Sequence, residues 1–312
     1  MNEVRSAAGR IKPYAHKTPV YTSKSINRMA GCSLWFKCEN LQKTGAFKFR
    51  GACNAVYSLT AEQASCGVVT HSSGNHGQAI SLAAQLRGIP AWVVMPSNST
   101  RIKIEAVKEY GAEVIFCEPT QSALEFNAEK LIKKTGAYFI HPFNDTNIIA
   151  GQATATLELL EEVPRLETIV VPVGGGGLLS GTAIAAKGLN AGIRVIGAEP
   201  EKADDAYRSF HSGKLVQPDS TDTIADGLRT SLGELTFAAI RRHVDDIVTV
   251  PEDSIIRGMR TVLERMKMVI EPSSAVALAA LLDGKISTPD RTGIVLTGGN
   301  VDLDHLPWVV SS

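Results

Sequence analysis

No charge of one sign predominates in this sequence of 312 residues, because 32 Lys and Arg residues are balanced by 32 Asp and Glu residues. The isoelectric point is accordingly near 7.1. A chain without excess positive charge has no general electrostatic attraction for nucleic acid or for an anionic membrane surface. We therefore expect neither as a partner, and a small neutral or zwitterionic molecule fits the charge balance better.

Cysteines are few, odd in number and without CxxC spacing, which argues against both a disulfide framework and a zinc site. We expect all five to be reduced packing residues: Cys32, Cys38, Cys53, Cys66 and Cys117.

Long apolar runs are also missing, since no stretch reaches the ~18 residues of a membrane span. Residues 1–12 carry charges and contain no apolar segment of signal-peptide length, so we expect a cytoplasmic protein. Hydrophobic residues nevertheless make up 44% of the chain, which is enough for one large core or two ordinary ones.

Short apolar segments alternate with segments of helical spacing along most of the chain. The expected strands are Leu34–Glu39, Val68–Thr70, Ala91–Val94, Glu113–Phe116, Tyr138–Ile140, Thr168–Val173, Arg194–Ala198, Asp246–Val250 and Ile294–Thr297. Such alternation predicts an α/β fold with parallel sheets covered by helices on both faces. We infer two doubly wound domains, a smaller one (64–145) inserted into a larger one (1–63 and 146–312). A ligand cleft is expected between them, at the carboxyl ends of the strands.

Lys48 stands between Phe47 and Phe49, at the start of an expected helix over 49–59. Apolar rings solvate a charged amine poorly, so the pKa of Lys48 should fall and release a neutral nucleophile for an aldehyde. Lys48 is therefore a candidate Schiff-base lysine. Alternatively, Lys48 and Arg50 are ordinary surface cations, and this stretch alone favours that interpretation.

Two loops that follow expected strands are suited to anions. Residues 72–78 read Ser-Ser-Gly-Asn-His-Gly-Gln, and their small side chains leave backbone N–H groups at a helix start free for a carboxylate. The alternative is a helix start capped by Ser73 and Asn75. Residues 174–177 are four successive glycines before Leu178, an arrangement that favours a phosphate cradle. No Gly-Lys-Ser/Thr follows, and GxGxxG spacing is absent, so neither a P-loop nor a dinucleotide site is indicated.

A lysine of low pKa, a carboxylate site and a phosphate cradle are together what pyridoxal 5'-phosphate and an amino-acid substrate require. The chain resembles the fold-type II pyridoxal-phosphate enzymes (tryptophan synthase β-like), in the serine/threonine dehydratase and serine racemase branch, nearest to its animal-type racemases. The resemblance covers nearly the whole chain and is carried by residues 43–51, 72–78, 174–178, 271–273 and 297–302.

The resemblance implies a role for each matching residue. Lys48 would bind the cofactor aldehyde, Phe47 would lie against the ring, and Asn75 would face its 3'-oxygen. The phosphate would be bound by Gly174, Gly175, Gly176, Gly177 and Leu178. A hydroxyl on Thr297 would face the pyridine nitrogen and leave the ring a weaker electron sink than a carboxylate would, which suits elimination and racemisation. The amino acid would meet Ser72, Ser73, Asn75 and His76.

Two further ligands are implied by the same resemblance. Glu199, Asp205 and the carbonyl of Ala203 would bind Mg²⁺, Ca²⁺ or Mn²⁺ through hard oxygen ligands. The alternative for these residues is an acidic helix start. ATP, as an activator at the subunit interface of a homodimer, would meet Ser23, Lys24, Ser25, Lys43, Thr44 and Tyr110.

The expected activity is exchange of the Cα proton by Lys48 on one face and Ser73 on the other, which interconverts L- and D-serine. Loss of the β-hydroxyl as water would yield pyruvate and ammonia. One alternative is an L-serine/L-threonine dehydratase without racemisation, and another is a racemase-dehydratase for aspartate or hydroxyaspartate. A non-catalytic binding protein for pyridoxal phosphate or an amino acid is a third. Residues 120–124 lack the arginine frequent in serine-acting relatives, and no serine run follows His141-Pro142 as in aspartate-specific ones.

Overall fold

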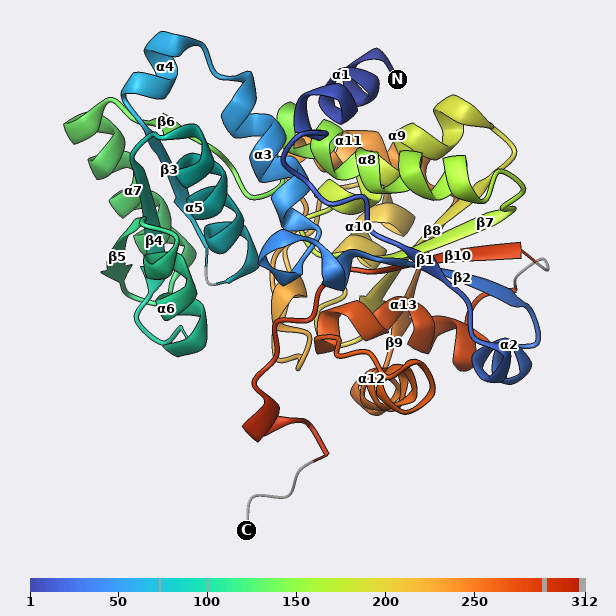
Figure 1. Ribbon diagram of the computed structural model, residues 1–312. Coiled ribbons are helices and arrows are strands. Elements are labelled where there is room, and N and C mark those ends of the chain that lie inside the picture. Colours follow the sequence, from blue (N-terminus) through green and yellow to red (C-terminus); the bar gives the residue numbers. More distant parts are fainter. Residues whose placement is uncertain (73, 100, 288–290, 309–312) are drawn as a thin grey trace.

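The computed structural model describes residues 1–72, 74–99, 101–287 and 291–308 (Figure 1). The strands are β1 (Val20–Tyr21), β2 (Ser33–Cys38), β3 (Val68–His71), β4 (Ala91–Pro96), β5 (Glu113–Cys117), β6 (Tyr138–Phe139), β7 (Thr168–Pro172), β8 (Arg194–Pro200), β9 (Asp246–Val250) and β10 (Arg291–Leu296). The α-helices are α1 (Asn2–Ile11), α2 (Lys24–Ala30), α3 (Lys48–Ser58), α4 (Ala61–Ser65), α5 (Asn75–Arg87), α6 (Arg101–Glu109), α7 (Gln121–Thr135), α8 (Thr146–Glu162), α9 (Gly177–Leu189), α10 (Asp205–Ser212), α11 (Glu234–His243), α12 (Glu252–Met266) and α13 (Pro272–Leu282). Short 3-10 turns are η1 (Glu39–Leu41), η2 (Lys43–Gly45), η3 (Asp226–Leu228) and η4 (Leu303–His305).

Two separate sheets organise the chain. The larger has the strand order β1-β2-β10-β7-β8-β9, in which only β1 runs antiparallel to its neighbour, and the smaller has the parallel order β5-β4-β3-β6. The expected α/β fold with parallel sheets is confirmed. Strands of the smaller sheet lie between residues 68 and 139, inside the segment predicted as the inserted domain, whose boundaries stay a prediction.

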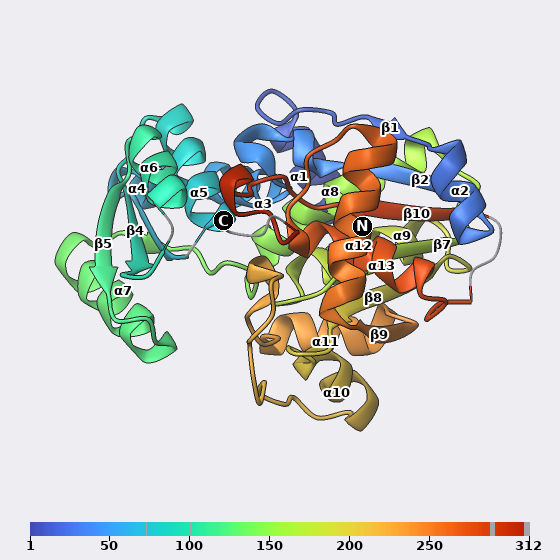
Figure 2. The ribbon, with the colours of Figure 1, turned by 90° about the horizontal axis from the view of Figure 1, so that it is seen from below.

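Neighbouring residues of each central strand enter different cores, because successive side chains of a strand point to opposite faces. Val170 and Ile196 pack toward α2, α12 and α13, whereas Ile169 and Val195 pack toward α8, α9 and α11. Figures 1 and 2 show these two groups of helices on opposite sides of the larger sheet. Burial on both faces explains why these strands are almost continuously apolar.

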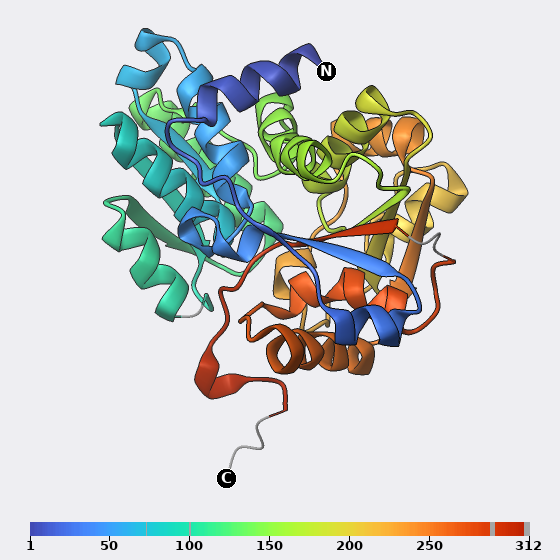
Figure 3. The same ribbon diagram turned by 45° about the vertical axis from the view of Figure 1, so that its right-hand side comes forward.

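The smaller sheet is covered in the same way. Val68 and Val93 pack with α3, α5 and α6, while Val69 and Val94 pack with α7 on the other face. Helix α3 therefore belongs to the core of the smaller sheet and also crosses α8, which covers the larger one (Figure 3). At the crossing, a Cβ on Gly151 would lie 2.6 Å from the Cα of Gly51, so only glycines allow the two helices to approach so closely.

A buried ion cluster fixes the first turn of α3. The guanidinium of Arg50 is fully buried and donates to Glu39 from Nε at 2.7 Å and from Nη2 at 2.9 Å. It also donates to both carboxylate oxygens of Glu158 at 2.8 and 2.7 Å, and Lys37 joins the same carboxylate at 2.6 Å. Arg50 is thus not the surface cation of the alternative interpretation. The cluster links β2, η1, α3 and α8.

Within the part of the chain that the structure describes, no helix has both the length and the apolar character needed to cross a membrane.

Replacing Arg50 by Met should lower the free energy of unfolding by about 3–5 kcal/mol, because two buried or partly buried carboxylates lose their partner. Arg260→Met, which removes an exposed arginine paired with Glu264 one helical turn away, should change stability by less than about 0.5 kcal/mol. Urea unfolding followed by circular dichroism measures both. Equal and small effects would contradict a central role for the cluster.

Candidate functional site: a cavity between the two sheets

A cavity of about 1070 Å³ lies between the two sheets, and we call it the central cavity. Eleven of the predicted cofactor and substrate residues line it: Phe47, Lys48, Ser72, Asn75, His76, Gly174, Gly175, Gly176, Gly177, Leu178 and Thr297. Ser73 lies outside the described residues, so its predicted role stays a prediction.

Lys48, the first residue of α3, directs its amine into this cavity. Its Nζ donates a hydrogen bond to the carbonyl of Pro142 at 3.1 Å, and the ring centroid of Phe47 lies 5.3 Å from it. Burial lowers the pKa of Lys48 to about 8, against the opposite influence of the Glu271 carboxylate. The side chain keeps some accessible surface because it faces the cavity, yet its amine lies deep enough to be poorly solvated.

The second ring expected beside Lys48 is elsewhere. Phe49 is fully buried in the core shared with the smaller sheet, and its ring centroid lies 5.7 Å from the amine of Lys43. Successive helical residues point in different directions, so two rings adjacent in sequence do not flank one amine. Depth in the cavity, more than a pair of flanking rings, lowers the pKa of Lys48.

The segment before Lys48 is fastened to the loop after β10. The backbone N–H of Phe47 donates to the carbonyl of Thr297 at 2.9 Å, and Asn300 donates from Nδ2 to the carbonyl of Thr44 at 2.7 Å. Thr44 has a φ of 59°, a left-handed conformation that costs a β-branched residue about 1–2 kcal/mol. A Cβ on Gly45 would lie 2.5 Å from Oδ1 of Asn300, so glycine is needed there for the two loops to meet.

Glu271 faces the same part of the cavity from the start of α13. Its two oxygens accept from Nδ2 of Asn75 at 2.9 and 3.0 Å, and Oδ1 of Asn75 accepts from Asn300 at 2.9 Å. Burial raises the pKa of Glu271 to about 7, Asp226 adds to the rise, and the Asn75 bond opposes it. Lys48 and Glu271 therefore both titrate close to neutral pH.

The four-glycine loop opens into the cavity ahead of α9. Gly176 has a φ of 84° and precedes the first residue of the helix, whose first amides lack acceptors within it. A Cβ on Gly175 would lie 2.2 Å from the ring of Phe143, so a side chain there would displace that ring. Bare amides at a helix start are suited to a phosphate, and phosphate binding by this loop stays a prediction.

Three histidines surround Lys48 from the side of the smaller sheet. Burial lowers the pKa of His71, of His76 and of His141, the last to about 4, and the positive charge of Lys48 adds to the lowering for His76 and His141. Nδ1 of His141 accepts from the backbone N–H of Asn144 at 3.0 Å, which orients the loop whose carbonyl meets Lys48. These rings are uncharged at neutral pH.

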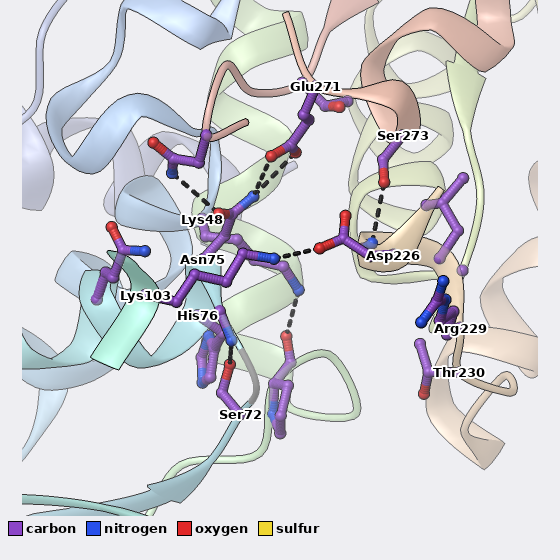
Figure 4. Close-up of a pocket in the computed structure, with 18 of the residues that line it drawn as sticks. Lys48, Ser72, Asn75, His76, Lys103, Asp226, Arg229, Thr230, Glu271 and Ser273 are labelled. Carbon is purple, nitrogen blue, oxygen red and sulfur yellow. Dashed lines mark hydrogen bonds and ion pairs between the residues drawn. The ribbon is translucent and has the colours of Figure 1, made fainter. Parts of the chain in front are cut away.

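One ion pair crosses the cavity. Lys103 of α6 reaches from the smaller-sheet side and pairs with Asp226 of η3 on the other side (Figure 4). Next to Asp226, the backbone N–H of Gly227 donates to Oγ of Ser273 at 2.9 Å, which holds η3 against α13.

The predicted metal ligands lie away from the central cavity, at the end of β8 and the start of α10. Glu199 is buried and accepts from the backbone N–H groups of Ala206 and Tyr207 at 3.0 and 2.8 Å. Burial raises the pKa of Glu199 well above its usual value, the Asp205 charge adds to this rise, and burial also raises the pKa of Asp205 to about 7. Oδ1 of Asp205 is buried without a hydrogen-bond partner in the described structure. No third Asp, Glu, His or Cys in the described ranges joins these two carboxylates, and Ala203 is buried beside them in the chain.

The residues predicted to meet ATP are distributed over three elements. Ser23, Lys24 and Ser25 lie at the start of α2, where Oγ of Ser23 accepts from the backbone N–H of Ile26 at 3.5 Å. Lys43 and Thr44 lie in η2, and Tyr110 follows α6. Of this set, Thr44 and Tyr110 line the central cavity.

The pyridoxal-phosphate dependent enzymes match residues 11–298, and the chain belongs to this family. The chain is 53% identical over 309 residues to a serine racemase of Arabidopsis thaliana, covering 97% of this chain and 93% of that one. It is 47% identical to a β-hydroxyaspartate dehydratase of Paracoccus denitrificans, with 98% of each chain covered. The solved structure of maize serine racemase superposes with a TM-score of 0.95 at 48% identity, covering 97% of this chain and 94% of that one.

The residues present fit pyridoxal phosphate. Lys48 supplies an amine whose pKa of about 8 leaves a reactive neutral fraction. The loop of Gly174–Gly177 supplies amides at a helix start for the phosphate. Asn75 and the buried Thr297 line the same cavity.

Sequence reasoning did not identify Glu271, Lys103 or Asp226 as site residues. Pro272 at the first helical position marks Glu271 as a helix start, yet no local pattern shows that its carboxylate faces Asn75. Lys103 and Asp226 are 123 positions apart, and only the tertiary fold brings them together.

The rate at which the cofactor-free protein attaches pyridoxal phosphate should rise as the pH rises through about 8, because the amine of Lys48 becomes neutral above its pKa. The visible absorbance of the lysine-bound cofactor measures this rate. Glu271→Gln should shift the midpoint to lower pH, since the Glu271 charge raises the pKa of Lys48. Lys48→Ala should show no such band. A band retained in Lys48→Ala, or a wild-type rate independent of pH, would contradict the assignment.

Proposed function

We propose that the protein is a pyridoxal-phosphate-dependent serine racemase that also eliminates water from serine to give pyruvate and ammonia. The single observation that carries this proposal is the buried amine of Lys48, with a pKa of about 8, facing a cavity lined by both anion-binding loops. Support comes from the serine racemases that the chain resembles over nearly its full length.

Pyridoxal phosphate, when bound, supplies an aldehyde for the substrate amine and an electron-withdrawing ring that acidifies the Cα–H bond. The amides at the start of α5, together with Ser72 and Asn75, would hold the substrate carboxylate. Nζ of Lys48, once free, would take the Cα proton on one face, and the hydroxyl of Ser73 would return or remove a proton on the other.

A second candidate is a dehydratase for β-hydroxy amino acids with little racemisation. It is favoured by the 47% identity to the β-hydroxyaspartate dehydratase. Both candidates share the proton removal at Lys48 and differ in what happens on the opposite face of Cα.

Ser73→Ala separates the two. In the wild type, L-serine should yield D-serine and pyruvate, and the variant should lose L-to-D conversion by about 100-fold or more while retaining pyruvate formation. Chiral chromatography and a coupled pyruvate assay follow both products in one reaction. A variant that still racemises at the wild-type rate rules out Ser73 as the second base, and a wild type that makes only pyruvate favours the dehydratase.

We also propose Mg²⁺, or Ca²⁺ or Mn²⁺, as a ligand of Glu199, Asp205 and the carbonyl of Ala203. Burial raises the pKa of both carboxylates and the Asp205 charge adds to the rise for Glu199, so a bound cation would stabilise their charged forms. The unpartnered Oδ1 of Asp205 offers a ligand atom.

Chelation should lower the melting temperature of the protein and added Mg²⁺ should restore it, because a ligand bound only by the folded state stabilises that state. Asp205→Asn should abolish the response to both. Asp219→Asn, which removes the same charge from an exposed position, should preserve it. Thermal shift measurements give these melting temperatures. An unchanged response in Asp205→Asn would favour the alternative, in which these residues are only an acidic helix start.

A homodimer, activation by ATP and a cytoplasmic location complete the proposal. The homodimer and ATP rest on the family resemblance. The location rests on the charged residues 1–12 and on the lack of a long apolar run in the sequence.

A further inference from the structure

The positively charged side chains that line the central cavity have different partners. Among its described lining residues, lysine or arginine occurs at Lys48, Lys103 and Arg229. Lys48 is needed by the cofactor, and Arg229 donates from Nε and Nη2 to the carbonyl of Thr223. Lys103 differs from both, because its partner is another charged side chain, that of Asp226.

Lys103 lies close to the expected carboxylate site. A Cβ on Gly74 would be 3.1 Å from Cδ and 3.3 Å from Nζ of Lys103, so the lysine stem runs along the residue that precedes α5. The side chain of Lys103 is only 16% exposed. Its ammonium thus reaches the region next to the substrate's α-carboxylate, where the β-substituent must lie.

Asp226 holds that ammonium from the opposite wall (Figure 4). The two charges act on Glu271 in opposite directions, since Asp226 raises its pKa and Lys103 lowers it. Both charges therefore lie near enough to Glu271 to influence its protonation. At close range a free ammonium would attract a second carboxylate, whereas a paired one, with an aspartate beside it, would not.

We propose that Lys103 and Asp226 together determine which substrate side chain is accepted. Asp226 neutralises Lys103, so the site favours an uncharged β-hydroxyl, as in serine or threonine, and disfavours a second carboxylate. The preference between substrates comes from repulsion of a second carboxylate by Asp226 as much as from its attraction by Lys103. This inference rests on the proposed function, because it concerns the substrate of the same site.

The test compares L-serine with L-threo-3-hydroxyaspartate, which has the same β-hydroxyl and adds one carboxylate at Cβ. Asp226→Asn should raise the ratio of kcat/KM for hydroxyaspartate to kcat/KM for serine by about tenfold or more, because a like charge is removed and Lys103 is released. Adding Lys103→Met to Asp226→Asn should abolish that gain. Lys103→Met alone should lower the ratio below the wild-type value.

Asp222→Asn is the matched control, because it removes the same charge four positions earlier from a side chain that is 88% exposed and does not line the cavity. Its ratio should equal that of the wild type. A ratio unchanged in Asp226→Asn, or a gain that persists in the double variant, would overturn the proposal. An equal fall of kcat/KM for both substrates in Asp226→Asn and Lys103→Met would also overturn it. That result would mean that the ion pair only holds the two sides of the cavity together.

A binding measurement separates this inference from the proposed function. Calorimetric titration of the cofactor-loaded protein with succinate and with butyrate compares a dicarboxylate and a monocarboxylate of equal carbon number. In Asp226→Asn the Kd for succinate should fall by about tenfold relative to the Kd for butyrate. If the wild type neither racemises serine nor forms pyruvate, the proposed function fails. The relative affinities still decide whether Lys103 and Asp226 control a second carboxylate.

Discussion

The position of the reactive lysine depends on the ion pairs that the buried guanidinium of Arg50 makes with two carboxylates. Arg50 lies two residues after Lys48, and its carboxylate partners come from η1, at the end of β2, and from α8, which covers the larger sheet. Taking these charges out of water is costly, and the cost is offset only while every donor finds its acceptor. The first turn of α3 therefore has one orientation relative to the sheet, and that orientation directs Lys48 into the cavity.

Lys48 and the nearby Glu271 both have a pKa near neutral pH. Burial lowers the pKa of the Lys48 amine although the Glu271 charge opposes this, and burial raises the pKa of Glu271 although its hydrogen bond from Asn75 opposes that. Such mutually opposed shifts are typical of sites that move protons at neutral pH. The neutral histidines on the other side add no charge that would reverse these shifts.

The fold was largely predictable from sequence. Segments such as 168–173 and 195–198 are buried on both faces, and this burial is visible in the sequence as nearly continuous apolar residues. Lys48 and the glycine loop were also predictable, because a reactive amine and a bare backbone need particular residue types. The role of Phe49 was predicted incorrectly, since the direction of a side chain depends on where the helix begins.

Other features of the site leave no local pattern. Glu271, Lys103 and Asp226 are common charged residues, and their function depends on what faces them across the cavity. The buried state of Arg50 is equally hidden, because its partners are 11 and 108 positions away. Contacts between distant segments are properties of the tertiary fold, so they appear only once the sheets are placed.

The way the smaller sheet is attached has a mechanical consequence. The chain enters this unit once, after α3, and leaves it once, between β6 and α8. The unit is also held through α3, which packs against both α5 and α8, and through the Lys103–Asp226 pair across the cavity. Helix α6 lies at the opposite end of the unit from α4, which follows the entry point (Figures 1 and 3). Because Lys103 belongs to α6, release of its pair with Asp226 would remove the ion pair that ties this far end of the unit to the larger sheet.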